Sequence, residues 1–269
     1  MVANTELQRV GLSGWRTGLA NLMRKENHAW WASLRQLVQS LLWTVVINGF
    51  VALMAFVLLP AGREVDPTLE SLESLTMGAE LLFKIGLLAL AFRTIVLAQD
   101  EILGERQLGV TEWLLSKPVS RPAYVLSKLL AHGLGVLVTL VGLHGALGYG
   151  LLSLIIGEPF PLPPYLLGMA GLAVHTLFYL ALTLMMGVLT ANRRVLLGVS
   201  QGVLLGGALL TNLPGTAVML TPWGLVNVLP AAVLELPLPL PIWLPIGVTA
   251  ILSVISVAVT LARFERLEF

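Results

Sequence analysis

The sequence predicts an all-α, polytopic membrane protein with six transmembrane helices, and two observations support this fold class. Of the 269 residues, 57% are hydrophobic and 12% are charged, which is about half the charged fraction of soluble domains. The apolar residues also form runs longer than the roughly 20 residues that a helix needs to cross a bilayer. No cysteine is present, which excludes disulfides, thiolate metal sites and cysteine nucleophiles.

Six apolar segments are long enough to span the bilayer. They cover residues 37–59, 77–98, 124–156, 165–190, 195–213 and 242–262. The third segment is longer than a bilayer requires, so we expect its first turns to project into water or its helix to break near a glycine. We treat residues 37–262 as a single transmembrane domain that includes a loop at 99–123. Terminal segments at 1–36 and 263–269 flank this domain.

Lysine and arginine residues gather on one side of the six segments. They precede the first segment, follow the sixth, and occupy the loops after the second and fourth segments. The loops of the other side contain Arg63 together with several aspartates and glutamates. Because cytoplasmic loops carry the excess of positive charge, we expect both termini and the loop at 99–123 to lie in the cytoplasm.

The segment before the first span is amphipathic at helical spacing. Its apolar face is predicted to consist of Trp15, Leu19, Leu22, Met23, Trp30 and Leu34. We expect an interfacial helix that lies along the cytoplasmic surface of the bilayer. A soluble helix that packs on a partner is the alternative.

Residues 212–241, between the fifth and sixth spans, are apolar but contain six prolines. Prolines at this density exclude one continuous helix. We therefore expect short re-entrant helices on the external side, with their backbone buried in protein.

The chain carries no familiar catalytic motif. It contains no GxxxxGK[ST] phosphate loop, no HExxH and no GxSxG, so we assign no catalytic residue, no metal ligand and no ATP-hydrolysing site. His132, His144 and His175 fall within predicted spans, where ionisable residues are functional candidates. An intramembrane metal- or cofactor-handling protein that uses these histidines is one alternative function. A non-catalytic membrane scaffold is another.

Glu80 and Lys84 in the second span stand four residues apart on one helix face, where they can form an ion pair. Together with Gln201 of the fifth span, they are candidates for the lining of a substrate path. The alternative is an interfacial ion pair that anchors the helix.

The fifth span contains three glycines at intervals of four residues, Gly198, Gly202 and Gly206. They form a groove that another helix can approach closely. The groove can be the seam of a dimer or can pack within one subunit.

Residues 109–128 indicate a short rigid helix between two spans rather than an irregular loop. Gly104 and Gly109 can break the helix that leaves the second span. The apolar face of the short helix is expected to consist of Val110, Trp113 and Leu114.

A corner follows this short helix. Pro118 ends the helix, because the residue before a proline disfavours helical angles. Ser120 can cap the next helix, and Pro122 fits its first turn. A short helix followed by a sharp corner is suited to receive force from another protein.

This segment resembles the cytoplasmic loop of type-2 ABC transporter permeases, the family that includes the nitrous-oxide-reductase maturation and sodium-export permeases. In that family an acidic residue precedes the motif G-[ST]-x-E-x-L-L-[ST]-x-P-[VI]-[ST]-R, and a tyrosine and a lysine follow it. The matching residues are Glu101, Gly109, Thr111, Glu112, Leu114, Leu115, Ser116, Pro118, Val119, Ser120, Arg121, Tyr124 and Lys128. The spacing departs at Val110, which separates Gly109 from Thr111. Residues 24–27, RKEN, resemble the basic-acidic element of the family's N-terminal interfacial helix.

The resemblance implies the permease subunit of an ATP-driven transporter, most typically an exporter, that is not an enzyme by itself. Two copies of the chain would form a homodimer around a central path, and two separate ATPase subunits would dock below them. ATP and Mg²⁺ would bind to the ATPases and not to this chain. The resemblance also implies the plasma membrane of a bacterium or archaeon, contact with lipid and none with nucleic acid; it does not specify the cargo.

The resemblance further implies which residues would couple the permease to the ATPase. They are Glu112, Trp113, Leu114, Leu115, Pro118 and Arg121. Glu112 and Arg121 would form ionic contacts or stabilise the corner, and the tryptophan and the two leucines would pack against the ATPase.

Overall fold

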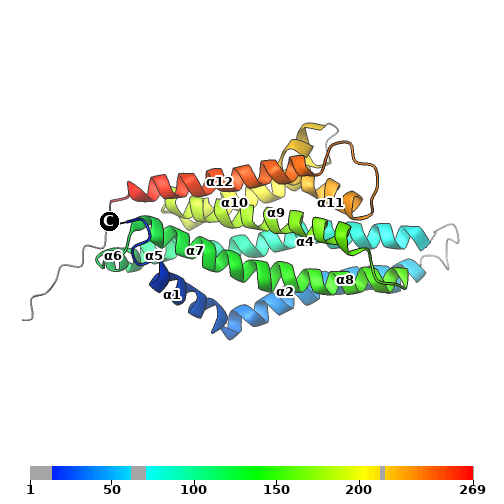
Figure 1. Ribbon diagram of the computed structural model, residues 1–269, viewed down its shortest axis with the longest axis horizontal. Helices are drawn as coiled ribbons and strands as arrows, with labels where there is room; N and C mark the ends of the chain where they lie inside the picture. Colours follow the sequence, from blue (N-terminus) through cyan, green and yellow to red (C-terminus); the bar gives the residue numbers. More distant parts are fainter. Residues whose placement is uncertain (1–13, 62–70, 213–215, 269) are drawn as a thin grey trace, which may run out of the picture.

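The computed structural model describes residues 14–61, 71–212 and 216–268, and every regular element in these ranges is a helix. Most helices run side by side along the long axis of an elongated bundle (Figure 1). The C-terminus and the short helices α5 (Leu103–Gln107) and α6 (Val110–Leu115) lie together at one end. We call this the C-terminal end of the bundle.

Six helical segments are long and apolar enough to cross a membrane, which confirms the predicted fold class. They contain α2 (Leu34–Leu53) with the π-helical η1 (Met54–Leu58), α4 (Ser71–Ala98), the run from α7 (Arg121–Val136) to α8 (Leu143–Ile156), α9 (Leu162–Leu189), α10 (Arg193–Leu210) and α12 (Trp243–Glu265). Each of them overlaps one of the six predicted spans.

The third segment is one helix from Arg121 to Ile156 that contains a π-helical stretch, η2 (Leu137–Gly142). A π-helical turn holds more residues per turn than an α-helical turn and locally distorts the helix. The predicted break near a glycine is thus a local widening that ends at Gly142, and the helix continues beyond it as α8.

Helix α9 forms the centre of the bundle and packs against α4, α7, α10, α11 (Leu225–Val233) and α12. Two glycines allow this close approach. A Cβ atom at Gly168 would lie 2.4 Å from Val233, and one at Gly171 would lie 2.5 Å from Leu229. Because both distances are far shorter than a van der Waals contact, any larger residue at these positions would push α11 away from α9.

The proline-rich segment after α10 consists of short pieces, as its prolines predict. Two 3-10 turns, η3 (Thr216–Leu220) and η4 (Pro222–Gly224), lead into α11. Helix α11 buries one apolar face against α9 and α4. That these pieces enter the bilayer from outside stays a prediction.

Helix α1 (Leu19–Trp31) packs against α7 with a narrower face than the sequence predicts. It buries Leu22, Glu26 and Trp30, whereas the side chains of Trp15 and Leu34 are exposed. The expectation of a six-residue apolar face was therefore wrong at both ends, because Trp15 precedes the helix and Leu34 already belongs to α2. The interfacial position of α1 stays a prediction.

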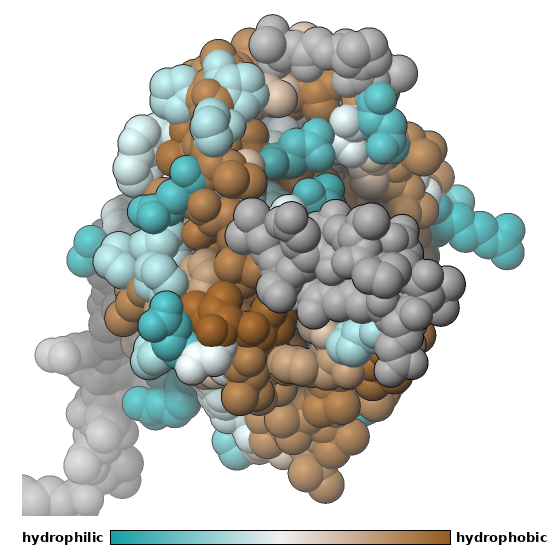
Figure 2. Space-filling model, turned by 90° about the vertical axis from the view of Figure 1, so that its right-hand side faces the viewer, coloured by the Kyte–Doolittle hydropathy of each residue, from teal (hydrophilic) through white to brown (hydrophobic). Residues whose placement is uncertain are grey.

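Apolar side chains cover much of the described surface. Figure 2, in which the end of the bundle opposite the C-terminal end faces the viewer, shows brown side chains between the polar ones on this end. On α2 the exposed residues include Val38, Leu42, Val45 and Val46. Exposed apolar side chains along a helix in this number are unfavourable in water and suit the hydrocarbon of a bilayer.

Candidate functional site

Two short helices connect α4 to α7 at the C-terminal end. Helix α4 ends at Ala98, α5 covers Leu103–Gln107, and α6 begins at Val110. Gly109 adopts a left-handed backbone conformation with φ of 69°, which glycine allows without steric strain. Gly104 lies inside α5, so the expectation that Gly104 breaks the helix was wrong; the break falls before α5.

The predicted contact residues of α6 point in opposite directions. The side chain of Trp113 is 60% exposed, and the Lys117 ammonium lies 4.5 Å from the centre of its ring. Glu112 is also exposed, and Leu115 is half-buried. Leu114, in contrast, is 8% exposed and packs into a cluster that includes residues of α1, α7, α9 and α12. Only the side that carries Glu112 and Trp113 is therefore available to another protein.

The corner between α6 and α7 forms as its sequence predicts. Ser120 caps α7, since its Oγ accepts a hydrogen bond from the backbone N–H of Ala123. The same Oγ donates to the carbonyl of Trp15 at 2.6 Å, and the Ser120 N–H donates to the carbonyl of Thr17 at 3.0 Å. The exposed Pro118 lies in the turn before this cap. The N-terminal segment thus holds the corner in place.

Arg121 joins the same corner to the end of α12. Its guanidinium donates hydrogen bonds to the carbonyls of Phe264 at 3.2 Å and Leu267 at 2.8 Å. These carbonyls lie at the C-terminal end of α12, where the helix dipole favours a cation. Of the two roles predicted for Arg121, its position favours stabilisation of the corner.

Helix α5 is attached to the turn between α9 and α10. The Arg106 guanidinium donates to the carbonyl of Gly187 at 2.8 Å. Arg193, at the start of α10, donates to Gln99 at 3.0 Å and pairs with Asp100 at 3.1 Å. The connection from α4 to α7 is thus attached to the end of α9 and to the start of α10.

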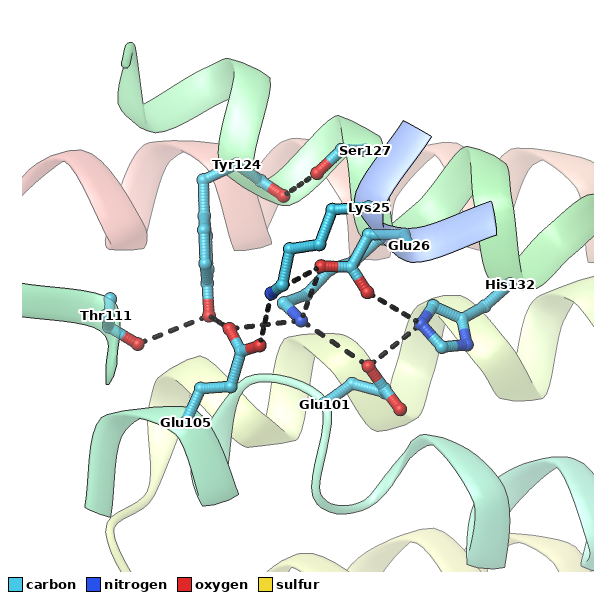
Figure 3. A network of polar contacts seen from close by, with 9 residues as sticks. Lys25, Glu26, Glu101, Glu105, Thr111, Tyr124, Ser127 and His132 are labelled. Atoms are coloured by element: carbon cyan, nitrogen blue, oxygen red, sulfur yellow. Dashed lines mark hydrogen bonds and ion pairs between the residues drawn. The ribbon is translucent and has the colours of Figure 1, made fainter. Parts of the chain in front are cut away.

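A buried network of charged side chains lies behind α6 (Figure 3). Its centre is the Lys128 ammonium of α7, whose side chain is 1% exposed. Three carboxylates surround this ammonium, at 3.4 Å for Glu26 of α1, 3.4 Å for Glu101 and 3.1 Å for Glu105 of α5. Because an unpaired charge is very costly to bury, the three helices must dock together for Lys128 to be accommodated. We call these four residues, together with the four described in the next paragraph, the ionic network.

Four more residues complete the ionic network. The Lys25 ammonium lies 2.9 Å from Glu105, and His132 Nε2 lies 2.8 Å from a Glu101 oxygen. The Tyr124 hydroxyl donates to Glu105 at 2.6 Å and lies 3.2 Å from the hydroxyl of Thr111. Since Thr111 belongs to α6, the network connects the outward-facing short helix to α1, α5 and α7.

The surroundings keep Glu26 ionised. Burial by itself would raise the pKa of the Glu26 carboxyl, but a hydrogen bond from His132 and the charge of Lys128 outweigh it and lower this pKa to about 2. Burial would likewise lower the pKa of Lys25, but contacts with Glu105 and Glu26 outweigh it and raise this pKa. Both residues are therefore charged at neutral pH.

Within the described ranges, Glu26, Glu101 and His132 are the one group of three side chains placed to hold a metal ion, with donor atoms within 4.8 Å of one another. The Lys128 ammonium, however, lies 3.4 Å from an oxygen of each carboxylate. A metal ion would have to displace this ammonium or share the carboxylates with it against the repulsion of like charges. We therefore interpret the cluster as a network of ion pairs.

The three histidines predicted to lie within spans do not come together. His132 belongs to the ionic network, whereas His144 Nδ1 lies 3.0 Å from the amide nitrogen of Asn48. His175 packs against Tyr179, with their ring centres 5.0 Å apart. This separation removes the geometric basis for one shared histidine site.

Glu80 and Lys84 form an ion pair of 2.8 Å on α4, with side chains that are 46% and 39% exposed. Both lie well inside α4, which begins at Ser71. On α10, a Cβ atom at Gly198, Gly202 or Gly206 would meet no heavy atom within 4 Å among the described residues. The glycine groove is therefore open in the single chain. Gln201 beside it is half-buried.

A family model described as "ABC-2 family transporter protein" matches residues 20–269. The chain belongs to this family. Among individually curated proteins, none matches the chain at a significant level. The ABC-2 assignment confirms the resemblance seen in the sequence and identifies the chain as the membrane subunit of an ABC transporter. An ABC-2 permease is not itself catalytic, and membership of the family implies an ABC ATPase as partner.

Sequence reasoning singled out many residues of the site without seeing that they meet. The family motif contains Glu101, Tyr124 and Lys128, and the RKEN element contains Lys25 and Glu26. The sequence analysis did not predict that Glu105 and His132 belong to the same network. Two spacings of four residues, from Glu101 to Glu105 and from Lys128 to His132, are the signal that could have indicated two facing polar surfaces.

Proposed function

We propose that this ABC-2 chain is the permease subunit of an ATP-driven exporter, and that α6 receives the force of a separate ATPase. The observation that carries this proposal is the position of α6. Its outer side presents Glu112 and Trp113 to solvent, while its inner side is fixed to the bundle through Leu114 and Thr111. An element that is exposed on one side and firmly attached on the other can transmit a push.

The contacts between α6 and the rest of the bundle determine which helices would move together with α6. Ser120 and Arg121 connect the corner to the N-terminal segment and to α12, and the ionic network connects it to α1, α5 and α7. Interiors that are closely packed transmit displacement instead of absorbing it. Movement of α6 would therefore tilt several spans together.

We propose that two copies of the chain associate through the face formed by α4 and α10. On this face Glu80 and Lys84 are partly exposed at a position inside a predicted span. Ionisable side chains at membrane depth are costly in lipid and normally face protein or a water-filled cavity. The open glycine groove of α10 lies on a helix that is mostly exposed in the single chain. A homodimer would cover this face and enclose a path lined by the ion pair and Gln201.

The C-terminal end of the bundle is proposed to face the cytoplasm of a bacterium or archaeon. Basic residues of the elements that meet there include Arg106 of α5, Lys117 after α6, Arg121 and Arg193 at the starts of α7 and α10, and Arg263 in the last turn of α12. Loops with an excess of lysine and arginine remain on the cytoplasmic side. This orientation places α6 on the side where ATP is available.

Site-directed photo-crosslinking tests the assignment of α6. A photoreactive amino acid such as p-benzoylphenylalanine in place of Trp113 is expected to capture a protein that hydrolyses ATP, when the full chain is expressed in its native membrane. The variant Trp113→Asp should abolish transport-linked ATP hydrolysis and leave the spans folded. As a matched control, Trp15→Asp changes another exposed indole at the same end and should have little effect. Normal hydrolysis and transport in the Trp113 variant would refute the assignment.

A further inference from the structure

A buried arginine lies between α2 and α4, which pack against each other. The side chain of Arg93, on α4, is 5% exposed. Its Nη2 donates hydrogen bonds to the side-chain oxygens of Gln36 at 2.9 Å and Gln39 at 2.7 Å, both on α2. Arg93 belongs to the last two turns of α4, and the two glutamines belong to the first two turns of α2. The contact therefore lies near the end of both spans from which α4 leads into α5.

The charge of Arg93 has no counter-ion among the described residues. Its two hydrogen-bond acceptors are neutral amides, and Nε is buried without a partner in the described part of the chain. Because arginine is not deprotonated in proteins, this guanidinium is always charged. A charge removed from water without an opposite charge is very unfavourable. The surroundings of Arg93 therefore lack one component, an anion.

One side of the guanidinium remains open to such an anion. Nη1 of Arg93 makes no hydrogen bond to a described residue and, unlike Nε, is not enclosed by protein atoms. Gln36 and Gln39 are themselves only half-buried. The guanidinium thus lies directly beneath the surface of the bundle, and a ligand can reach it without any rearrangement of the helices.

A second arginine stands beside the same contact. Arg35 is exposed in the first turn of α2 and has no ion pair with a described residue. It directly precedes Gln36 and lies four residues before Gln39, so Arg35 and Gln39 share one face of the helix. The first turn of a helix also carries the positive end of its dipole. Positive charge from two side chains and one helix end therefore gathers at this place.

The surface that continues from the two arginines along the spans is apolar. On α2, Leu42 is 58% exposed and Val46 is 57% exposed, and Phe92 of α4 is 37% exposed. Leu42 and Val46 follow Gln39 by three and seven residues, which places them on the same face of α2. A molecule that has an anionic head and long apolar chains matches this sequence of surfaces.

We propose that Arg93 and Arg35 bind the phosphate of an anionic phospholipid, in the leaflet at the C-terminal end of the bundle. Phosphate oxygens would accept hydrogen bonds from Nη1 of Arg93 and from the Arg35 guanidinium, whose planar arrangement of donors suits phosphate. The acyl chains would follow Leu42 and Val46. Basic sites between transmembrane helices recognise anionic lipid head groups on the cytoplasmic side, and that leaflet is the cytoplasmic one in the proposed orientation.

Photolabelling of the full chain in nanodiscs of phosphatidylcholine tests this lipid site. The probe is a phosphatidylglycerol with a diazirine at the start of one acyl chain, and the control probe is a phosphatidylcholine with the same chains. We expect the phosphatidylglycerol probe to label the first turns of α2 or the last turns of α4 at least about tenfold more, since a hydrogen bond between charged groups contributes that much. Equal labelling by both probes would overturn the proposal.

Competition distinguishes a lipid from a soluble anion. Unlabelled phosphatidylglycerol should displace the probe, whereas inorganic phosphate at millimolar concentration should not, because it has no apolar chains to bury. Displacement by inorganic phosphate as strong as that by the lipid would indicate a general anion site and would overturn the assignment to a phospholipid.

Replacement of single arginines tests which side chains bind the lipid. Arg93→Met should reduce labelling by the phosphatidylglycerol probe about tenfold, and Arg35→Met should reduce it about fivefold, as expected for one basic residue near an anionic lipid. Arg194→Met is the matched control, because it removes an exposed arginine from the first turn of α10. This control should label like the wild type.

Gln39→Glu supplies the missing anion from within the chain. It keeps the shape of the side chain and places a carboxylate oxygen where the amide oxygen now lies 2.7 Å from Nη2 of Arg93. Labelling should fall about tenfold, because the internal carboxylate replaces the lipid phosphate. Phosphatidylglycerol should also raise the unfolding temperature of the wild type more than that of Gln39→Glu, since a ligand stabilises the folded state that binds it.

If Arg93→Met and Gln39→Glu are folded and label like the wild type, the lipid site is wrong. Because no ATPase takes part, that result would leave the proposed role of α6 unaffected, and failure of the α6 experiment would leave this one unaffected.

Discussion

Two lysines on the long helices of this protein have opposite surroundings. Lys128 is 1% exposed and lies within 3.4 Å of three carboxylates from three segments. Lys84 is 39% exposed and has a described ion pair with Glu80, four residues away on its own helix. One ammonium is neutralised by long-range contacts, and the other retains access to molecules outside the chain.

The difference indicates what each charge does. A buried charge that is surrounded by partners holds helices together, and removing any partner leaves another charge unpaired. A partly exposed pair within one helix adds little to stability, and charges at membrane depth normally face protein or a water-filled cavity. The ionic network thus holds helices together, and we propose that the region of Lys84 is a binding surface.

Lys128→Met should have the largest effect on stability. It leaves three carboxylates without their central cation, and losing one partner of a buried ion pair costs about 3–5 kcal/mol. We expect a lower thermal unfolding temperature in detergent and faster hydrogen exchange in α1, which depends on Glu26 for docking. The matched variant Lys84→Met should change stability by less than about 1 kcal/mol. Equal unfolding temperatures of the two variants would contradict the proposed difference between a structural Lys128 and a Lys84 that contributes little to stability.

Acidification should loosen the ionic network through Glu26. Because its folded-state pKa is lowered from 4.5 to about 2, the stabilisation is complete above pH 4.5 and is lost as pH falls toward 2. The shift corresponds to a free energy on the order of 3 kcal/mol. Denaturant unfolding between pH 6 and pH 3 should therefore depend less on pH in Glu26→Gln than in the wild type. If the free energy of unfolding depends on pH equally in the wild type and in Glu26→Gln, this role of Glu26 is wrong.

Helix α6 allows the same comparison between adjacent residues. Leu114→Ala removes a buried side chain and should destabilise the protein by roughly 2 kcal/mol. Trp113→Ala changes an exposed side chain and should alter stability by no more than about 0.5 kcal/mol, although it should impair ATPase coupling. Thermal unfolding together with ATP hydrolysis of the assembled complex would distinguish the two effects. Loss of coupling only in the Leu114 variant would indicate that the inner side of α6 is the important one.

Gly202→Leu should have the smallest effect on the single chain, because a Cβ atom there meets no described atom within 4 Å. If the groove is the dimer seam, the added side chain should weaken association between copies, which crosslinking or mass measurement in nanodiscs would detect. An unchanged dimer would place the seam elsewhere and would separate the glycine groove from the Lys84 surface.

The sequence by itself determined the features that depend on neighbouring residues. Hydropathy identified the six spans, because a bilayer requires runs of apolar residues. Ser120 and the adjacent prolines predicted the cap and the corner, since these depend on backbone angles and hydrogen bonds within a few residues. The family motif drew attention to Glu101, Tyr124 and Lys128.

The tertiary structure alone decided how distant residues meet and which way each side chain faces. Glu26 and Lys128 are 102 positions apart, and their contact requires α1 to dock on α7 in one particular orientation. The outward position of Trp113, the inward position of Leu114 and the contact of Arg93 with Gln39 likewise depend on how each helix is rotated about its axis. Local sequence patterns limit this rotation only weakly in helices that are apolar on every side, so packing between helices has to determine it.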